Sequence, residues 1–347
     1  MNAFIGRFNA ADLMRHTFPP VQWVVPGIIP QGMTLLAAAP KAGKSWLVLG
    51  LALAIAEGGQ ALGALDVTPR PVLYLALEDG PSRLQYRLEQ LGVGDDAPPE
   101  LEFLTKPGPA GAVAAIEEYL AETGHLSPVV ILDTFGRARP ASAPNANQYQ
   151  LDYAHAARLK ETVDAYPGSA LIVVHHTRKG AAEDFLDAVS GTQGLAGAAD
   201  TVAVLKRDRE ALDAVLQVTS RDAREGSYAL QLDESGRWTL AGSSLAEAQT
   251  AAEAIEAKLG KGQSMGRIVD ALAELARDVR PLELAEHLGM PPATVRQYLL
   301  RLADDGRIKK VARGLYRAYG ASSCAVCGEP LDAINAEAGT HPGCEAA

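Results

Sequence analysis

Residues 38–45 constrain the fold of this chain most strongly, because they read AAPKAGKS and separate an apolar strand-like run from an apolar helix-like run. The P-loop pattern is Gly-x4-Gly-Lys-Ser/Thr between a strand and a helix. Gly43, Lys44 and Ser45 fit this pattern, whereas Ala38 stands where the first glycine is expected. The alternative is a chance Gly-Lys-Ser before a helix.

Such a loop binds phosphate because its amides and the helix N-terminus direct donors at one point. Lys44 would contact the β- and γ-phosphates, and the Ser45 hydroxyl would contact magnesium. The motif therefore predicts a site for ATP with magnesium. Its expected residues are Pro40, Lys41, Ala42, Gly43, Lys44, Ser45 and Trp46.

Apolar strand-like runs alternate with helical patterns between residues 33 and 206, which predicts an α/β fold with a mainly parallel sheet and helices on both faces. Expected strands cover 33–38, 72–77, 101–104, 129–133, 170–175 and 201–206, and expected helices cover 46–56, 82–91, 112–122 and 150–165. Shorter runs at 214–219, 228–232 and 238–240 suggest antiparallel hairpins at one sheet edge.

Three polar residues follow apolar runs, at the strand ends where open α/β sheets bind ligands. Asp133 fits a carboxylate that holds the magnesium shell. Glu78 fits a general base that polarises water, and His176 fits a sensor of the γ-phosphate. The alternatives are a turn-capping Asp133, a Glu78 placed to favour a helix dipole, and a His176 that is an ordinary surface group.

With these residues in place, the chain from about 22 to 240 resembles a RecA-fold ATPase of the RepA-like hexameric helicases, found in plasmids, phages and mobile elements. The resemblance rests on the order of several short stretches rather than on any one of them. They are PGIIPQG at 26–32, PKAGKSW at 40–46, YLALED at 74–79, ILDTF at 131–135, HHTRK at 175–179 and SGTQGLAGAAD at 190–200.

The resemblance implies that Glu78 is the catalytic carboxylate and that His176 senses phosphate. It also implies a homohexameric ring with ATP between subunits, where a neighbour supplies an arginine finger. Arg221 is the first choice for this finger and Arg207 the second, and Arg87 matches a family arginine near the phosphates. Any of the three could instead be an ordinary surface arginine.

DNA contacts in such rings come from loops that face a central channel. Here the loop after Asp133 carries Arg137 and Arg139, and the loop after His176 carries Arg178 and Lys179. These basic residues predict sequence-tolerant, salt-sensitive binding of single-stranded DNA, since the loops offer almost no aromatic side chains for base stacking. Solvated loops without a ligand are the alternative.

The segment 265–320 is predicted to be a winged-helix domain, because two helical patterns around a glycine turn precede a hairpin pattern. The second helix carries Thr294, Arg296, Gln297 and Arg301. Residues 291–318 contain seven Lys/Arg and two Asp, a net charge of +5 in a chain whose net charge is −10. This asymmetry favours contact with duplex DNA. A protein docking module is the alternative.

All three cysteines lie in the tail 321–347, where Cys324 and Cys327 precede His341 and Cys344. Two close pairs with this spacing predict a structural Cys3His zinc site. A disordered tail with free thiols is the alternative.

The expected organisation is a RecA-like ATPase domain at 1–240, a linker with a helical part at 241–264, the winged helix and the zinc tail. No secretory signal or membrane span is visible, so a cytoplasmic protein without membrane contact is expected. The sequence predicts an ATP hydrolase that is a ring-forming DNA helicase or translocase of plasmid, phage or mobile-element replication. A recombination or annealing ATPase and an ATP-controlled DNA-binding regulator remain alternatives.

Overall fold

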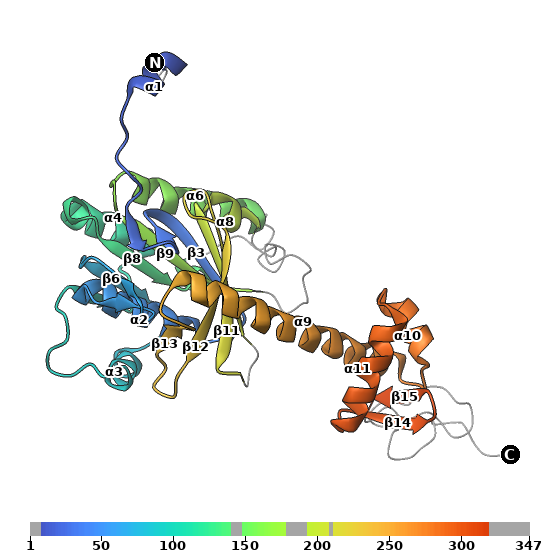
Figure 1. The fold of residues 1–347 in the computed structure, drawn as a ribbon. Coiled ribbons are helices and arrows are strands. Elements are labelled where there is room, and N and C mark those ends of the chain that lie inside the picture. The colour runs from blue at the N-terminus through green and yellow to red at the C-terminus, as the bar shows by residue number, and fades with distance from the viewer. Residues whose placement is uncertain (1–7, 140–147, 178–192, 208–210, 319–347) are drawn as a thin grey trace. The chain divides into compact units, whose positions relative to one another are not determined.

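The computed structural model describes residues 8–139, 148–177, 193–207 and 211–318. The chain divides into two compact units, Met1–Ile255 and Glu256–Ala347. The first unit is built on a large sheet, and the second is a small helical unit with one hairpin (Figure 1).

A nine-stranded sheet forms the centre of the first unit, in the order β13-β12-β11-β10-β3-β9-β8-β6-β7. Six of its strands are parallel, and β11, β12 and β13 extend the sheet in antiparallel register. The parallel strands are β3 (Gly32–Ala38), β6 (Val72–Ala76), β7 (Leu101–Leu104), β8 (Val129–Asp133), β9 (Ala170–His176) and β10 (Thr201–Arg207), and the antiparallel strands are β11 (Asp213–Ser220), β12 (Gly226–Leu232) and β13 (Trp238–Leu240).

Helices cover both faces of this sheet, so its central strands are buried on both sides. One core joins α2 (Lys44–Glu57) and α3 (Pro81–Gln90) to alternate strand residues such as Ile131 and Ile172. The other joins α4 (Gly111–Thr123), α6 (Gln148–Asp164) and α8 (Gln193–Ala198) to the strand residues that alternate with these and point to the opposite face, such as Val130 and Val173. Because side chains alternate along a strand, continuously apolar runs such as 129–132 supply both cores.

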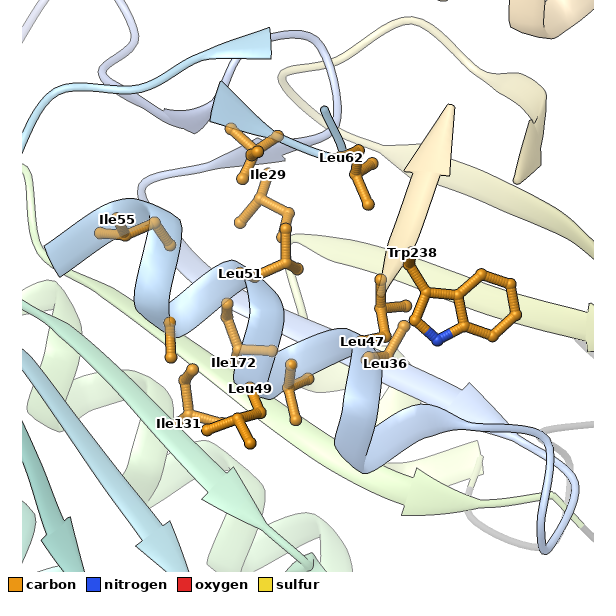
Figure 2. Packing of buried hydrophobic residues seen from close by; sticks show 14 of the residues in the cluster. Ile29, Leu36, Leu47, Leu49, Leu51, Ile55, Leu62, Ile131, Ile172 and Trp238 are labelled. Carbon is orange, nitrogen blue, oxygen red and sulfur yellow. The ribbon is translucent and has the colours of Figure 1, made fainter. Parts of the chain in front are cut away.

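Helix α2 is apolar around its whole circumference, and nine of its fourteen residues are buried. A helix of this composition is stable only when it is covered on all sides. Figure 2 shows Leu47, Leu49, Leu51 and Ile55 packed among side chains from the sheet and its edge, with Trp238 beside the first turn of the helix. This burial fixes the N-terminus of α2 at the end of β3.

Smaller elements complete the first unit. They are the helices α1 (Ala10–Arg15) and α5 (Phe135–Ala138), the 3-10 helix η1 (Gly124–Leu126), and the hairpins β1 (Trp23–Val25) with β2 (Ile29–Pro30) and β4 (Gln60–Ala61) with β5 (Leu65–Asp66). Neither hairpin was expected from the sequence, because each strand is too short for a periodic pattern.

The second unit contains a winged helix, as the sequence predicted. It is formed by the end of α9 (Leu245–Leu275), α10 (Pro281–Leu288), α11 (Pro292–Asp304) and the hairpin of β14 (Ile308–Ala312) with β15 (Leu315–Ala318). Ile268, Leu284, Val295 and Leu299 belong to its core. Gly289 ends α10 with φ at 64°, which meets the need for a left-handed residue at this turn.

The fold class is therefore confirmed as α/β, with a mainly parallel sheet that carries the P-loop, followed by a winged helix. The predicted zinc-binding tail lies outside the described residues. In the segment 241–264, where a linker with a helical part was expected, helix α9 begins at Leu245. In the described part of the chain, no helix is long and apolar enough to cross a membrane.

Candidate nucleotide-binding site

The predicted phosphate loop connects the end of β3 to the start of α2. Gly43 lies directly before the helix with φ at 97°, and Lys41 also has a positive φ, of 67°. Ala38, in contrast, is the last residue of β3 and pairs with both Leu205 and His176. Its backbone is extended, so the position needs no glycine, and this explains how alanine is accommodated there.

Lys44 is the most buried charged side chain of the loop, with 5% of its surface exposed. Its Nζ donates to the Ala39 carbonyl oxygen at 3.3 Å and lies 3.0 Å from His176 Nδ1. Burial lowers the pKa of Lys44, and the carboxylates of Asp133 and Glu78 oppose this shift. Because a charged ammonium group only donates, His176 Nδ1 accepts here, and a neutral imidazole then carries its proton on Nε2.

Asp133 ends β8 and is 3% exposed. Its Oδ2 accepts a hydrogen bond from the Tyr74 hydroxyl at 2.8 Å. Burial raises the pKa of Asp133, and hydrogen bonding from Tyr74 and Ser45 opposes that rise. Within the described residues, Oδ1 is buried without a partner in normal hydrogen-bond geometry. A buried carboxylate oxygen of this kind, close to the Ser45 hydroxyl, fits a magnesium ion, which prefers oxygen ligands.

Glu78 lies just after β6, at the same sheet edge as Asp133 and His176. Its Oε1 accepts from the Thr134 hydroxyl at 2.8 Å, and its Oε2 lies 3.8 Å from His176 Nε2. About 40% of the Glu78 side chain is exposed, compared with 42% for His176. The structure thus joins Lys44, His176, Glu78 and Thr134 in one chain of contacts that opens to solvent.

Arg87 lies on α3 and faces the first residue after the P-loop motif. Its guanidinium is 5.4 Å from the ring centroid of Trp46, a cation–π geometry. Asp79 pairs with Arg87 and also with Arg83, at 2.9 Å. The Asp79 side chain is only 7% exposed. Asp79 therefore holds Arg87 in place, a role that the sequence did not indicate.

The two finger candidates lie at opposite ends of the neighbouring strands β10 and β11. Arg207 ends β10, and its Nη1 is 3.5 Å from the carbonyl oxygen of Ala42 in the P-loop. Arg221 follows β11, whose last residue pairs with Thr201 at the start of β10. These two ends are about 20 Å apart along the strand direction, which is the length of the seven-residue strand β3. Arg221 is 65% exposed and lies 3.7 Å from Asp200.

The predicted DNA-contacting arginines of the first loop behave differently from each other. Arg137 is exposed. Arg139 is turned inward, because it pairs with buried Asp152 at 2.7 Å and lies over the ring of Phe135. Arg139 thus makes both of these contacts within its own chain. Arg178 and Lys179 lie outside the described residues.

In the winged helix, Arg296, Gln297 and Arg301 are exposed on α11, and Lys309 and Lys310 are exposed on β14. Thr294 is partly buried. The predicted zinc ligands Cys324, Cys327, His341 and Cys344 lie outside the described residues.

Sequence reasoning missed three residues that contact the site. Tyr74 lies within a continuously apolar strand and Thr134 follows Asp133, so neither has a motif of its own. Trp238 belongs to the edge strand β13, yet its Nε1 donates to the Gly43 carbonyl oxygen at 3.2 Å. No local pattern reports a contact between residues so far apart in the chain.

A P-loop, a buried strand-end aspartate and a nearby exposed glutamate at one edge of a parallel sheet define the class of P-loop ATPases. Within that class, the family described as an AAA domain matches residues 6–182, slightly more than half of the chain. The protein belongs to this AAA domain family. Residues 266–312 are similar to the IclR helix-turn-helix domain, which coincides with the winged helix.

Two solved structures are similar to the chain. One is a DnaB-like replicative helicase, described with its interactions with primase, with 17% identity and a TM-score of 0.49 over 60% of this chain and 58% of the helicase. The chain thus spans less than two-thirds of that protein. The other is a KaiC-like protein from the archaeon Pyrococcus horikoshii, with 13% identity and a TM-score of 0.45 over 64% of this chain and all of that one.

His175, next to the candidate sensor, is half-buried near the end of β9. Its Nδ1 has no hydrogen-bond partner among the described residues, and its ring meets Phe135 edge-on with the centroids 6.0 Å apart. Burial, together with the charge of Arg139, lowers the pKa of His175 to about 4. In the unfolded chain, a histidine takes up its proton near pH 6.5.

We therefore predict that acid destabilises the fold through His175. Between about pH 6.5 and pH 4 the unfolded chain binds a proton that folded His175 does not, so the free energy of unfolding falls as pH falls. His175→Gln should reduce this loss by at most about 3 kcal/mol. Urea unfolding of the wild type and of the variant at pH 7 and pH 4.5 measures the loss of stability in each protein. Asp133, whose raised pKa contributes with the opposite sign, is present in both proteins, so its contribution cancels when the two losses are subtracted. The exposed His125→Gln is the control, and equal losses in His175→Gln and wild type would contradict the assignment.

Proposed function

We propose that this protein is an ATP-driven, ring-forming DNA helicase or translocase of plasmid, phage or mobile-element replication. The observation that carries the proposal is the meeting of Lys44, Asp133, Glu78 and His176 at one edge of the sheet. Lys44, at the start of α2, contacts His176, and His176 in turn faces Glu78. The charge of Asp133 acts on Lys44 from the end of β8. They supply a phosphate ligand, a magnesium ligand, a base and a sensor.

Glu78 has the position expected of a general base for ATP hydrolysis. Thr134 holds one carboxylate oxygen, which leaves the partly exposed side chain able to accept a proton from water. As that water attacks the γ-phosphorus, the bond to the ADP oxygen breaks. Lys44 and the loop amides stabilise the charge on the phosphates, and Ser45 and Asp133 would hold magnesium, which supplies further charge neutralisation.

His176 is suited to sense the γ-phosphate because it competes for Lys44. In the structure, Lys44 Nζ contacts His176 Nδ1, while the other ring nitrogen faces Glu78. A bound γ-phosphate would draw the ammonium group away and would itself accept from the imidazole Nε2–H. The loop that begins after β9 would then respond to the presence of the γ-phosphate.

The trans arginine finger remains part of the proposal. Arg221 is largely exposed and lies at the strand ends opposite its own P-loop. This position suits contact with another subunit's site rather than its own. Arg207 is the second candidate. Ring assembly as a homohexamer follows from the family resemblance, with ATP between neighbouring subunits.

Two features support DNA as the partner. Exposed basic residues on α11 and β14 suit duplex DNA, and the similarity to a helix-turn-helix domain covers the same segment. Exposed Arg137 follows the Asp133 strand and suits a single strand in a central channel. A structural zinc site in the tail completes the proposal. A recombination ATPase or an ATP-controlled regulator would use the same nucleotide chemistry.

The role of Glu78 predicts a specific kinetic effect. Glu78→Gln should retain MgATP binding and slow turnover by about 100-fold or more, because the amide cannot accept the proton. Lys44→Ala should instead weaken nucleotide binding. Steady-state hydrolysis and calorimetric titration with MgATP measure the two effects. Glu89→Gln, an exposed change on nearby α3, should leave both unaltered. Unchanged turnover in Glu78→Gln would sink the assignment.

A site shared between subunits predicts complementation. Arg221→Ala and Lys44→Ala should each be nearly inactive alone, whereas a mixture should recover part of the activity. Some interfaces in the mixture then combine Lys44 of one chain with Arg221 of another. The measurement is ATP hydrolysis against mixing ratio. An inactive mixture, in subunits that mass measurement shows to have exchanged, would argue against Arg221 in trans.

The class of activity is tested by strand displacement beside mass measurement with and without ATP. We expect a closed hexamer, DNA-stimulated hydrolysis and displacement of a labelled strand. Filaments on single strands would indicate recombination instead. Sequence-specific duplex binding without displacement would indicate a regulator.

A further inference from the structure

The hairpin of β12 and β13 packs directly against the P-loop from the antiparallel end of the sheet. Trp238, only 4% exposed, donates its indole N–H to the Gly43 carbonyl oxygen at 3.2 Å. A Cβ atom placed on Gly43 would lie 2.9 Å from the Trp238 ring. Gly43 therefore gives the loop its positive φ and also leaves room for the indole.

Arg207 fixes the other side of this contact. Its guanidinium lies 5.7 Å from the ring centroid of Trp238, and its Nε donates to the Ala211 carbonyl oxygen at 2.6 Å. Its Nη1 is 3.5 Å from the Ala42 carbonyl oxygen, the outer limit of a hydrogen bond. Two consecutive loop carbonyls thus face donors from β10 and β13.

The turn that leads into β13 adds a second contact. A Cβ atom on Gly236 would lie 2.4 Å from the Trp46 ring, so the turn backbone lies directly against that side chain. Between these contacts, Arg237 donates to the Leu91 carbonyl oxygen beyond α3. Three successive residues, 236 to 238, therefore hold the hairpin against the loop and its surroundings.

These contacts bear on phosphate binding through peptide geometry. In a planar trans peptide, the carbonyl oxygen and the following amide hydrogen point in opposite directions. Holding the carbonyls of Ala42 and Gly43 toward the hairpin turns the amides of Gly43 and Lys44 away from it. The Gly43 carbonyl also accepts from Leu47 N at 3.0 Å in the first turn of α2. The loop amides are donors that such a site offers to phosphate.

We infer that Trp238 and Arg207 are positioning residues that preset the P-loop for phosphate, an inference that rests on the proposed ATPase function. They act through the loop backbone and not on the nucleotide itself. This gives Arg207 a role within its own chain. A trans finger would act on another subunit, in the transition state, and would leave ADP binding alone.

The test is calorimetric titration with MgADP, which contains no γ-phosphate and undergoes no hydrolysis. Trp238→Phe keeps most of the ring and removes the N–H donor, so affinity should fall about three- to tenfold, the effect of one lost hydrogen bond. Trp23→Phe, on strand β1, is the matched control and should bind as wild type does. Urea unfolding without nucleotide checks that Trp238→Phe remains folded.

Arg207→Gln provides a second variant, which stands even if Trp238→Phe does not fold. Positioning predicts a three- to tenfold loss of MgADP affinity and a raised KM for ATP, whereas a trans finger alone predicts a lower kcat with unchanged MgADP affinity. MgADP affinity equal to wild type in the folded variants would overturn the inference. A wild-type protein that binds no MgADP would instead overturn the proposed function.

Discussion

The burial of α2 is the constraint on which the rest of the structure depends. The helix has no polar face, so it must be enclosed by the parallel strands, the β1–β2 and β4–β5 hairpins and the antiparallel extension. Enclosing it places its N-terminus, with Gly43 and Lys44, at the sheet edge where β6, β8 and β9 also end. The apolar packing shown in Figure 2 and the chemistry of the site are therefore consequences of one helix position.

Charge balance then decides how the site is arranged around that N-terminus. Lys44 loses hydration on burial, and the carboxylates of Asp133 and Glu78 offset part of that cost. Asp133 is itself buried, and its Oδ1 has no partner among the described residues, so the edge retains an oxygen for a cation. Glu78 stays more exposed than Asp133, which is consistent with one carboxylate for metal and another for water.

Much of this architecture could be predicted because the parallel strands are continuously apolar and their ends carry polar residues. Strand β8 was expected at 129–133 and has those bounds, and α4 differs from its expected bounds by one residue at each end. The full length of helix α9 was harder to predict from the sequence, because Gly260, Gly262 and Gly266 weaken the helical pattern. Ser244 and Glu247 cap its start, and buried Ala248, Ala252 and Leu272 supply packing that local propensity does not report.

The sequence alone determined the P-loop, the order of strands and helices, and the strand-end positions of Asp133, Glu78 and His176, because these depend on local pattern and on the common edge of parallel strands. Only the tertiary structure decided which arginine approaches the loop. Sheet register puts Arg207 beside the P-loop and Arg221 at the opposite ends of the strands, although both follow strand-like runs. It also brought Trp238 onto Gly43 and turned Arg139 inward onto Asp152. Such contacts join residues that are separated in sequence and form when the strands and helices pack together, so no local spacing could specify them.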